Sequence, residues 1–93
     1  MIQIRIQNGN NARLRAILVD LATHIEMRRG DALLTCDTEE QLLIGRAVFE
    51  KLLTTGGHTA FSVQEGTGES EMVKELDRAT YPLIVIMGPI AGG

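Results

Sequence analysis

The segment 32–63 constrains the fold most, because it reads as a helix between two short apolar segments. The apolar side chains of the stretch 38–55 recur at the three- and four-residue spacing of an amphipathic helix. They are Leu42, Val48, Phe49, Leu52 and Leu53. The flanking segments 32–36 and 59–63 are short enough to be buried strands. A strand–helix–strand crossover of this kind favours some parallel pairing in the sheet.

Both ends of the helix 38–55 carry boundary residues. Thr38 or Asp37 is placed to cap its N-terminus, and Thr38 with Gln41 fits a capping box. Glu39 and Glu40 suit the positive end of the helix dipole, and Gly56-Gly57 ends the helix. The sequence therefore predicts one well-bounded main helix at this place.

Strand patterns lie at both ends of the chain. Residues 2–6, Ile-Gln-Ile-Arg-Ile, alternate strictly, which predicts a strand with its isoleucines inward. Residues 83–87 form the clearest apolar strand, and Pro82 precedes it at a position where a missing N–H costs little. Residues 72–76 fit a short edge strand.

The stretch 12–29 is open to two interpretations. Its apolar residues fall at helical spacing, with Asn11 as N-cap and Arg28-Arg29-Gly30 as a cationic last turn and C-cap. Asn8-Gly9 is instead a hairpin motif, which would make 12–19 a second strand. The helix is preferred because residues 16–19 do not alternate. The prediction is an α+β domain with a mixed sheet of four to five strands and its helices mostly on one face.

Bulk properties exclude several classes of function. The 93 residues make one domain, 1–93, with an aliphatic core, because only three residues are aromatic. A net charge of −3 without a basic patch argues against nucleic acid and anionic membranes as partners. No leader sequence and no apolar run of membrane-spanning length is recognised, so a cytoplasmic location is expected.

Residues that could carry catalysis are few and scattered. The single cysteine, Cys36, lies in an apolar stretch and is expected to be a buried, inert thiol. His24 and His58 have no second ligand at metal-binding spacing, so no metal site is predicted. The segment 66–68, Gly-Thr-Gly, lacks the lysine and the following helix of a phosphate loop, so a plain turn is expected. The chain is predicted not to be an enzyme and to bind no cofactor itself.

The segment 83–93 reads Leu-Ile-Val-Ile-Met-Gly-Pro-Ile-Ala-Gly-Gly. An apolar strand that runs through a proline-containing turn into a small residue and two glycines resembles the C-terminus of the ubiquitin-like sulfur carriers. Among these carriers, the segment looks like the tail of the small subunit of molybdopterin synthase. The resemblance implies a β-grasp fold with 38–55 as its main helix, and a flexible tail over 88–93.

The resemblance also implies a mechanism in which this chain is the substrate. The Gly93 carboxylate would attack the α-phosphate of ATP within a separate adenylating enzyme. Gly92 belongs to the same activation site, while Pro89 would stiffen the exit from the sheet, and Ile90 and Ala91 would thread the enzyme's channel. Transfer to an enzyme cysteine and then to an amine would conjugate the chain to a target protein, with a conjugating enzyme as a further partner.

Two differences from the sulfur carriers favour conjugation. Gly88-Pro89 stands where the family usually carries two prolines. The family also begins with a β-hairpin, so the first thirty residues need either the hairpin interpretation or an insertion. A sulfur carrier with a C-terminal thiocarboxylate remains the alternative fate of the tail. A non-catalytic interaction module that assembles through its sheet edge is a second class.

Overall fold

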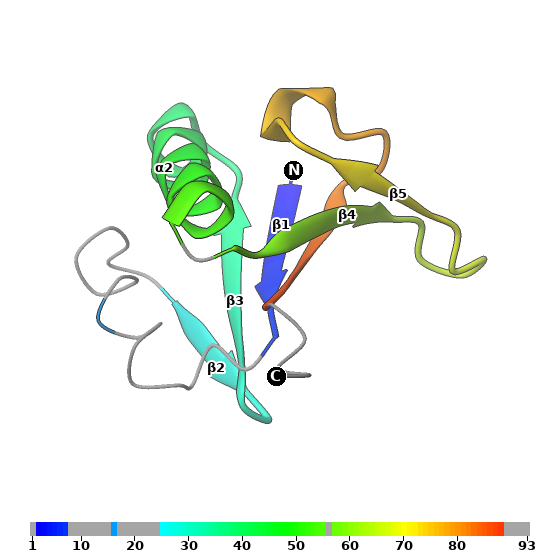
Figure 1. Ribbon diagram of the computed structural model, residues 1–93, viewed down its shortest axis with the longest axis horizontal. Coiled ribbons are helices and arrows are strands. Elements are labelled where there is room, and N and C mark those ends of the chain that lie inside the picture. The colour runs from blue at the N-terminus through cyan, green and yellow to red at the C-terminus, as the bar shows by residue number, and fades with distance from the viewer. Residues whose placement is uncertain (1, 8–15, 17–24, 56, 89–93) are drawn as a thin grey trace.

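A mixed β-sheet covered on one face by a helix forms the structure, a computed structural model that describes residues 2–7, 16, 25–55 and 57–88 (Figure 1). Its elements in chain order are β1 (Ile2–Ile6), β2 (Glu26–Arg28), β3 (Asp31–Cys36), α2 (Glu39–Thr55), β4 (Thr59–Val63), β5 (Ser70–Val73), the short 3₁₀ helix η1 (Leu76–Arg78) and β6 (Leu83–Met87). The α+β class and the main helix are confirmed, as are the strands predicted at 2–6, 59–63 and 83–87.

The six strands lie in the order β2-β3-β1-β6-β4-β5. Strands β1 and β6 pair in parallel at the centre, and the other neighbouring strands in the described chain pair antiparallel. The predicted parallel pairing therefore exists, but it joins the first and last strands. The strands that α2 connects, β3 and β4, are separated by β1 and β6.

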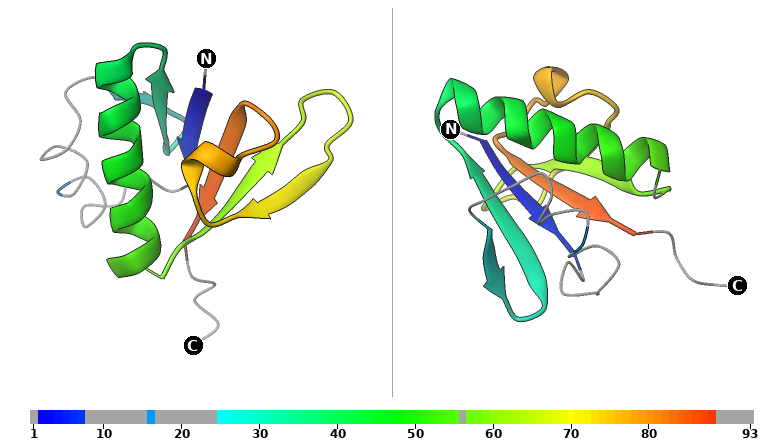
Figure 2. Two further views of the ribbon diagram at one scale, coloured as in Figure 1. Left: turned by 90° about the horizontal axis from the view of Figure 1, so that it is seen from above. Right: turned by 90° about the vertical axis from the view of Figure 1, so that its left-hand side faces the viewer.

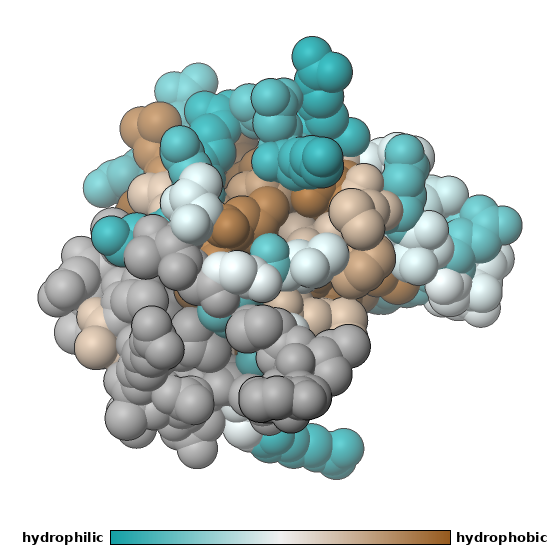
Figure 3. All heavy atoms as spheres, viewed as in Figure 1, coloured by the Kyte–Doolittle hydropathy of each residue, from teal (hydrophilic) through white to brown (hydrophobic). Residues whose placement is uncertain are grey.

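The core lies between α2 and the sheet face that α2 crosses (Figure 2). Alternate residues of β1, β3, β4 and β6 point into it, so the isoleucines of β1 lie inward as predicted. Figure 3 shows apolar side chains gathered between α2 and β4, bordered by polar ones over η1 and over the turn after β4. The buried apolar cluster comprises Ile4, Ile6, Ala32, Leu34, Cys36, Val48, Phe49, Leu52, Ala60, Val73, Leu76, Ile84 and Ile86.

The start of α2 is a complete capping box, as the sequence predicts. The Thr38 hydroxyl accepts a hydrogen bond from the Gln41 backbone N–H at 3.1 Å. In return, Gln41 Oε1 accepts from the backbone N–H groups of Asp37 at 2.8 Å and Thr38 at 3.1 Å. Backbone donors that a helix start leaves without partners are thus satisfied, which fixes where the helix begins.

The predicted helix over 12–29 is wrong at its C-terminal end, because residues 26–28 form the edge strand β2. Arg29 and Gly30 have positive φ values of 51° and 88° and turn the chain from β2 into β3. A helix C-cap and a tight hairpin turn both require positive φ, so the presence of Gly30 could not distinguish a helix end from a hairpin turn. The alternatives for 12–19 lie outside the described residues except at Ala16. Within the described residues the sheet has six strands, where four to five are expected.

The edge strand predicted at 72–76 exists, but its predicted bounds are wrong. Strand β5 runs from Ser70 to Val73, and Leu76 belongs to η1. Both Val73 and Leu76 are buried, and a three-residue interval between inward side chains suits a 3₁₀ turn rather than a strand.

One buried polar group breaks the pattern of the core. The side chain of Ser62 is fully buried on β4, and its hydroxyl finds no hydrogen-bond partner among the described residues. A buried donor left without a partner costs about 1–3 kcal/mol. We expect Ser62→Ala to raise the free energy of unfolding by about 1 kcal/mol in urea denaturation. The exposed Ser70→Ala on β5 is the matched control and should change it by less than about 0.5 kcal/mol. A clear loss of stability in Ser62→Ala would show that the hydroxyl is satisfied.

Within the described part of the chain, no helix has both the length and the apolar character needed to cross a membrane.

Candidate functional site

The strand that leads to the diglycine lies in the middle of the sheet. Strand β6 pairs with β1 on one side and with β4 on the other. It ends at Met87, and Gly88 follows. The residues proposed for activation and threading, 89–93, lie outside the described residues. The structure therefore defines the anchor from which this segment departs.

His58 lies beside that anchor. Its backbone N–H donates to the Leu52 carbonyl at 3.2 Å, and its Nδ1 lies 3.2 Å from the same oxygen. A Cβ placed on Gly88 would lie 3.5 Å from His58 Nε2, which is an ordinary contact distance. The half-buried imidazole thus packs between the end of α2 and the last described residue of the chain. This contact gives His58 a structural place at the end of β6.

The sheet face opposite α2, here called the outer face, carries an apolar stripe. The strand register brings the residues of the stripe together. It pairs Phe61 with both Val85 and Met72, and it pairs Val63 with Leu83. Its side chains alternate with those of the core. Met72 is 59% exposed and Met87 is 38% exposed, so the stripe reaches solvent at β5 and at the end of β6.

Two arginines flank the stripe near the end of β6. Arg5 lies on β1 directly opposite Val85, and Arg29 lies in the turn between β2 and β3. With Asp31 and Leu33 they line a hollow of about 560 Å³. Both guanidinium groups are exposed. The end of the outer face from which β6 leaves the sheet therefore offers positive charge beside apolar surface.

A cysteine–histidine catalytic pair is not formed by Cys36 and His58. Cys36 pairs with Ile2 at one end of the sheet, and His58 precedes Thr59, which pairs with Met87 at the other end. Cys36 is 1% exposed, and burial raises the pKa of its thiol. The prediction of a buried thiol is confirmed, and its raised pKa opposes formation of a reactive thiolate. His24 lies outside the described residues.

The other sequence features also take ordinary structural places. Among the described residues, no three side chains of the types that bind metals come together. Gly66 and Gly68 have φ values of 97° and 76° in the turn between β4 and β5, which confirms a plain turn. Its hydrogen bonds run from the Gly68 N–H to the Gln64 carbonyl and from the Gln64 N–H to the Glu69 carbonyl.

The outer face and its two arginines were missed at the sequence level. Alternation in 2–6 and 83–87 indicates two faces for each strand, but it does not say which strands are neighbours. Only the register brings Arg5 beside Val85 and Phe61 beside Met72. Comparison of the chain with protein-family models, curated proteins and solved structures gave no match.

Proposed function

We propose that this chain is a ubiquitin-like protein of the β-grasp type, activated at Gly93 and conjugated to a target protein. The observation that carries the proposal is the strand order β3-β1-β6-β4-β5, in which the first and last strands pair in parallel at the centre. A first antiparallel pair, a main helix and a last central strand leading to the tail are what a β-grasp requires. Here the antiparallel pair is β1 and β3, and the intervening segment holds the extra edge strand β2.

The position of β6 suits a strand that must present a tail to another protein. Because β6 is hydrogen-bonded on both sides, tension on Gly88 and the residues after it acts on the centre of the sheet rather than on a frayed edge. The outer face beside it combines Val85 and Met87 with the guanidinium of Arg5. Apolar area with a charged rim is the usual composition of a protein–protein interface. We propose that the adenylating enzyme docks there.

The chemistry belongs to the partner enzymes. The Gly93 carboxylate attacks the α-phosphate of ATP, which releases pyrophosphate and leaves an acyl-adenylate. A thiolate of the enzyme displaces AMP to give a thioester, and an amine of the target displaces the thiolate to give an isopeptide bond. Glycine suits Gly93 and Gly92 because it has no Cβ to obstruct a narrow channel. Pro89, Ile90 and Ala91 are proposed to lead the diglycine into that channel.

The proposal is tested in the native host with N-terminally tagged protein. We expect immunoblots under reducing, denaturing conditions to show species larger than the free chain, and a variant lacking Gly93 to show the free chain alone. Larger species that are seen only on non-reducing gels would indicate thioesters rather than isopeptides. If the unaltered chain and the variant lacking Gly93 give the same pattern of bands, the proposal is wrong.

Sulfur transfer is the second outcome of the same activated tail. Replacement of AMP by a sulfide equivalent would leave a thiocarboxylate on Gly93 and no larger species on the blot. The exposed Met72 and Met87 favour a third class, an assembly module that works through the outer face without activation of its tail. Such a module would be unaffected by loss of Gly93.

A further inference from the structure

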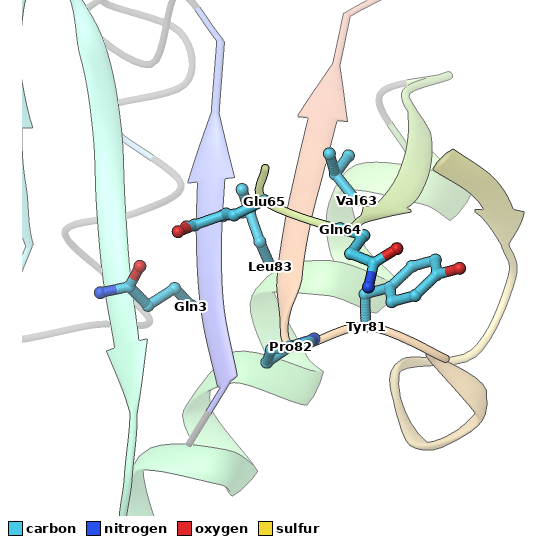
Figure 4. A pocket seen from close by; sticks show the side chains of 7 residues that line it. All are labelled: Gln3, Val63, Gln64, Glu65, Tyr81, Pro82 and Leu83. Atoms are coloured by element: carbon cyan, nitrogen blue, oxygen red, sulfur yellow. The ribbon is translucent and has the colours of Figure 1, made fainter. Parts of the chain in front are cut away.

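A pocket of about 420 Å³ opens on the outer face at the end of the sheet away from Gly88 (Figure 4). Three separate parts of the chain build it: the start of β1, the end of β4 with the turn after it, and the entry into β6. Its lining residues are Gln3, Val63, Gln64, Glu65, Tyr81, Pro82 and Leu83. Figure 4 shows α2 behind the sheet, so the pocket faces away from the core.

The floor of the pocket is apolar and fixed by the sheet. Val63 and Leu83 are register partners on β4 and β6, and Leu83 is 8% exposed. Pro82 is held where the chain enters β6, because its carbonyl accepts a hydrogen bond from the Gln3 backbone N–H at 2.9 Å. An aliphatic chain lying on this floor would remove apolar area from water.

The rim of the pocket is acidic. The Glu65 side chain extends over Leu83 toward β1, on the side where the Gln3 amide lies (Figure 4). Glu65 and Gln3 make no side-chain hydrogen bond or ion pair with any described residue. The Tyr81 hydroxyl donates to Glu69 Oε2 at 3.1 Å, which places a second carboxylate beside the pocket. Within the described lining there is no lysine or arginine to neutralise them.

The Tyr81 and Gln64 side chains are oriented by neighbours. The hydrogen bond to Glu69 holds the Tyr81 hydroxyl and raises its pKa. Gln64 Oε1 accepts from the Thr67 hydroxyl at 2.9 Å. Glu65 and Gln3 Oε1 have no side-chain partner among the described residues, so both can accept a hydrogen bond from an incoming donor.

We propose that this pocket binds an arginine side chain of a partner protein. The methylene stem would lie on Leu83, Val63 and Pro82, as long cationic side chains do on apolar surface. The planar guanidinium would donate to the Glu65 carboxylate and to Gln3 Oε1. An anionic group would meet two carboxylates, and a purely apolar group would leave Glu65 without compensation.

This assignment does not rest on activation of Gly93. The pocket lies at the start of β6, and Gly88 follows the other end of that strand. The rise per residue of an extended strand puts the two about 15 Å apart. A partner held by Glu65 could therefore leave the tail accessible. The experiment below uses no enzyme and no tail chemistry, so either proposal can fail alone.

The test is an NMR titration of the ¹⁵N-labelled full chain with Nα-acetyl-arginine methylamide at constant ionic strength. We expect saturable shifts at the side-chain amides of Gln3 and Gln64 and at the backbone amides of Glu65 and Leu83. The norleucine analogue, which keeps the stem and lacks the cation, should bind several-fold more weakly. Glu65→Gln should weaken arginine binding about fivefold to tenfold, because a charge-assisted hydrogen bond is lost.

Glu50→Gln is the matched control, since Glu50 is an exposed carboxylate on α2. It should leave the titration unchanged. Equal binding of the norleucine analogue, or an unaltered affinity in Glu65→Gln, would overturn the proposal. The lysine analogue is titrated in the same way, and tighter binding of it than of the arginine compound would overturn the assignment to arginine. Shifts that do not saturate or do not map to the pocket would also overturn it. Spectra of the free variants establish that each is folded.

Discussion

Gly45→Ala is expected to destabilise the fold, although alanine is the better helix former. Gly45 is buried on α2 opposite β3. A Cβ added there would lie 2.6 Å from Cys36 Sγ, closer than real Cβ atoms approach. Overpacking of this kind costs about 1–3 kcal/mol, and the gain in helix propensity returns about 1 kcal/mol. We therefore expect a net loss of about 1 kcal/mol, a fall in Tm of about 4–8 °C for a domain of this size.

The cause of that loss can be isolated by a second substitution. In a Cys36→Ala background the sulfur is absent, and the next contacts of the new Cβ are Ile4 Cδ1 at 3.4 Å and Cys36 Cβ at 3.8 Å, which are ordinary. Gly45→Ala should then be neutral or stabilising, so the effect changes sign. Ala47→Gly, at an exposed position of α2, measures the propensity term alone and should be the same in both backgrounds. An equal loss from Gly45→Ala in both backgrounds would contradict this account of the helix–strand contact.

Deletion of Gly93 is expected to abolish every covalent product of the tail while leaving the fold unchanged. The reacting carboxylate would move to Gly92 and be one residue too short to reach the adenylation site. A single serine appended after Gly93 should have the same effect, because it removes the glycine carboxylate and adds a Cβ at the reacting end. The measurement is the fraction of tagged protein in conjugated or thiocarboxylated form in the native host.

Two controls separate loss of chemistry from loss of structure. Both tail variants should melt at the same temperature as the unaltered chain, because residues 89–93 lie beyond the end of β6 at Met87. A substitution at an exposed position of α2, such as Glu50→Gln, should retain full modification. If the variant lacking Gly93 is modified as well as the unaltered chain, the tail is not the reacting group.

Most of the helices and strands can be predicted from the sequence, because the patterns that define them involve residues close together in the chain. The alternation in 2–6 and the capping box at Thr38 and Gln41 each depend on a few neighbouring residues, and the structure has both. The helix prediction was wrong at residues 26–28 because three residues, Glu-Met-Arg, are too few to show the alternation of a strand. Gly30 indicates a positive φ, which either a helix end or a turn requires. Such a three-residue edge strand is defined by its partner β3, which lies across the turn.

The candidate surfaces could not be predicted in the same way. The pocket joins Gln3 to Tyr81 and Glu65, and the apolar stripe joins Phe61 to Val85. These combinations exist only because β1 lies beside β6 and β6 beside β4. The sequence does not reveal these combinations, because hydrophobic alternation indicates which face of a strand is buried but not which strands lie beside it. The diglycine is the opposite case, because the proposal for its chemistry rests on residues 92–93 of the sequence alone.

The most direct test of the central claim is tandem mass spectrometry of the peptide that ends in Gly93, from N-terminally tagged protein recovered from its own host. The account predicts Gly93 in an isopeptide bond to an amine of another protein. A thiocarboxylate at Gly93 would keep tail activation and replace conjugation with sulfur transfer. An unmodified carboxylate, found while candidate partner enzymes are present and active, or a chain that continues beyond Gly93 in the mature protein, would contradict the account.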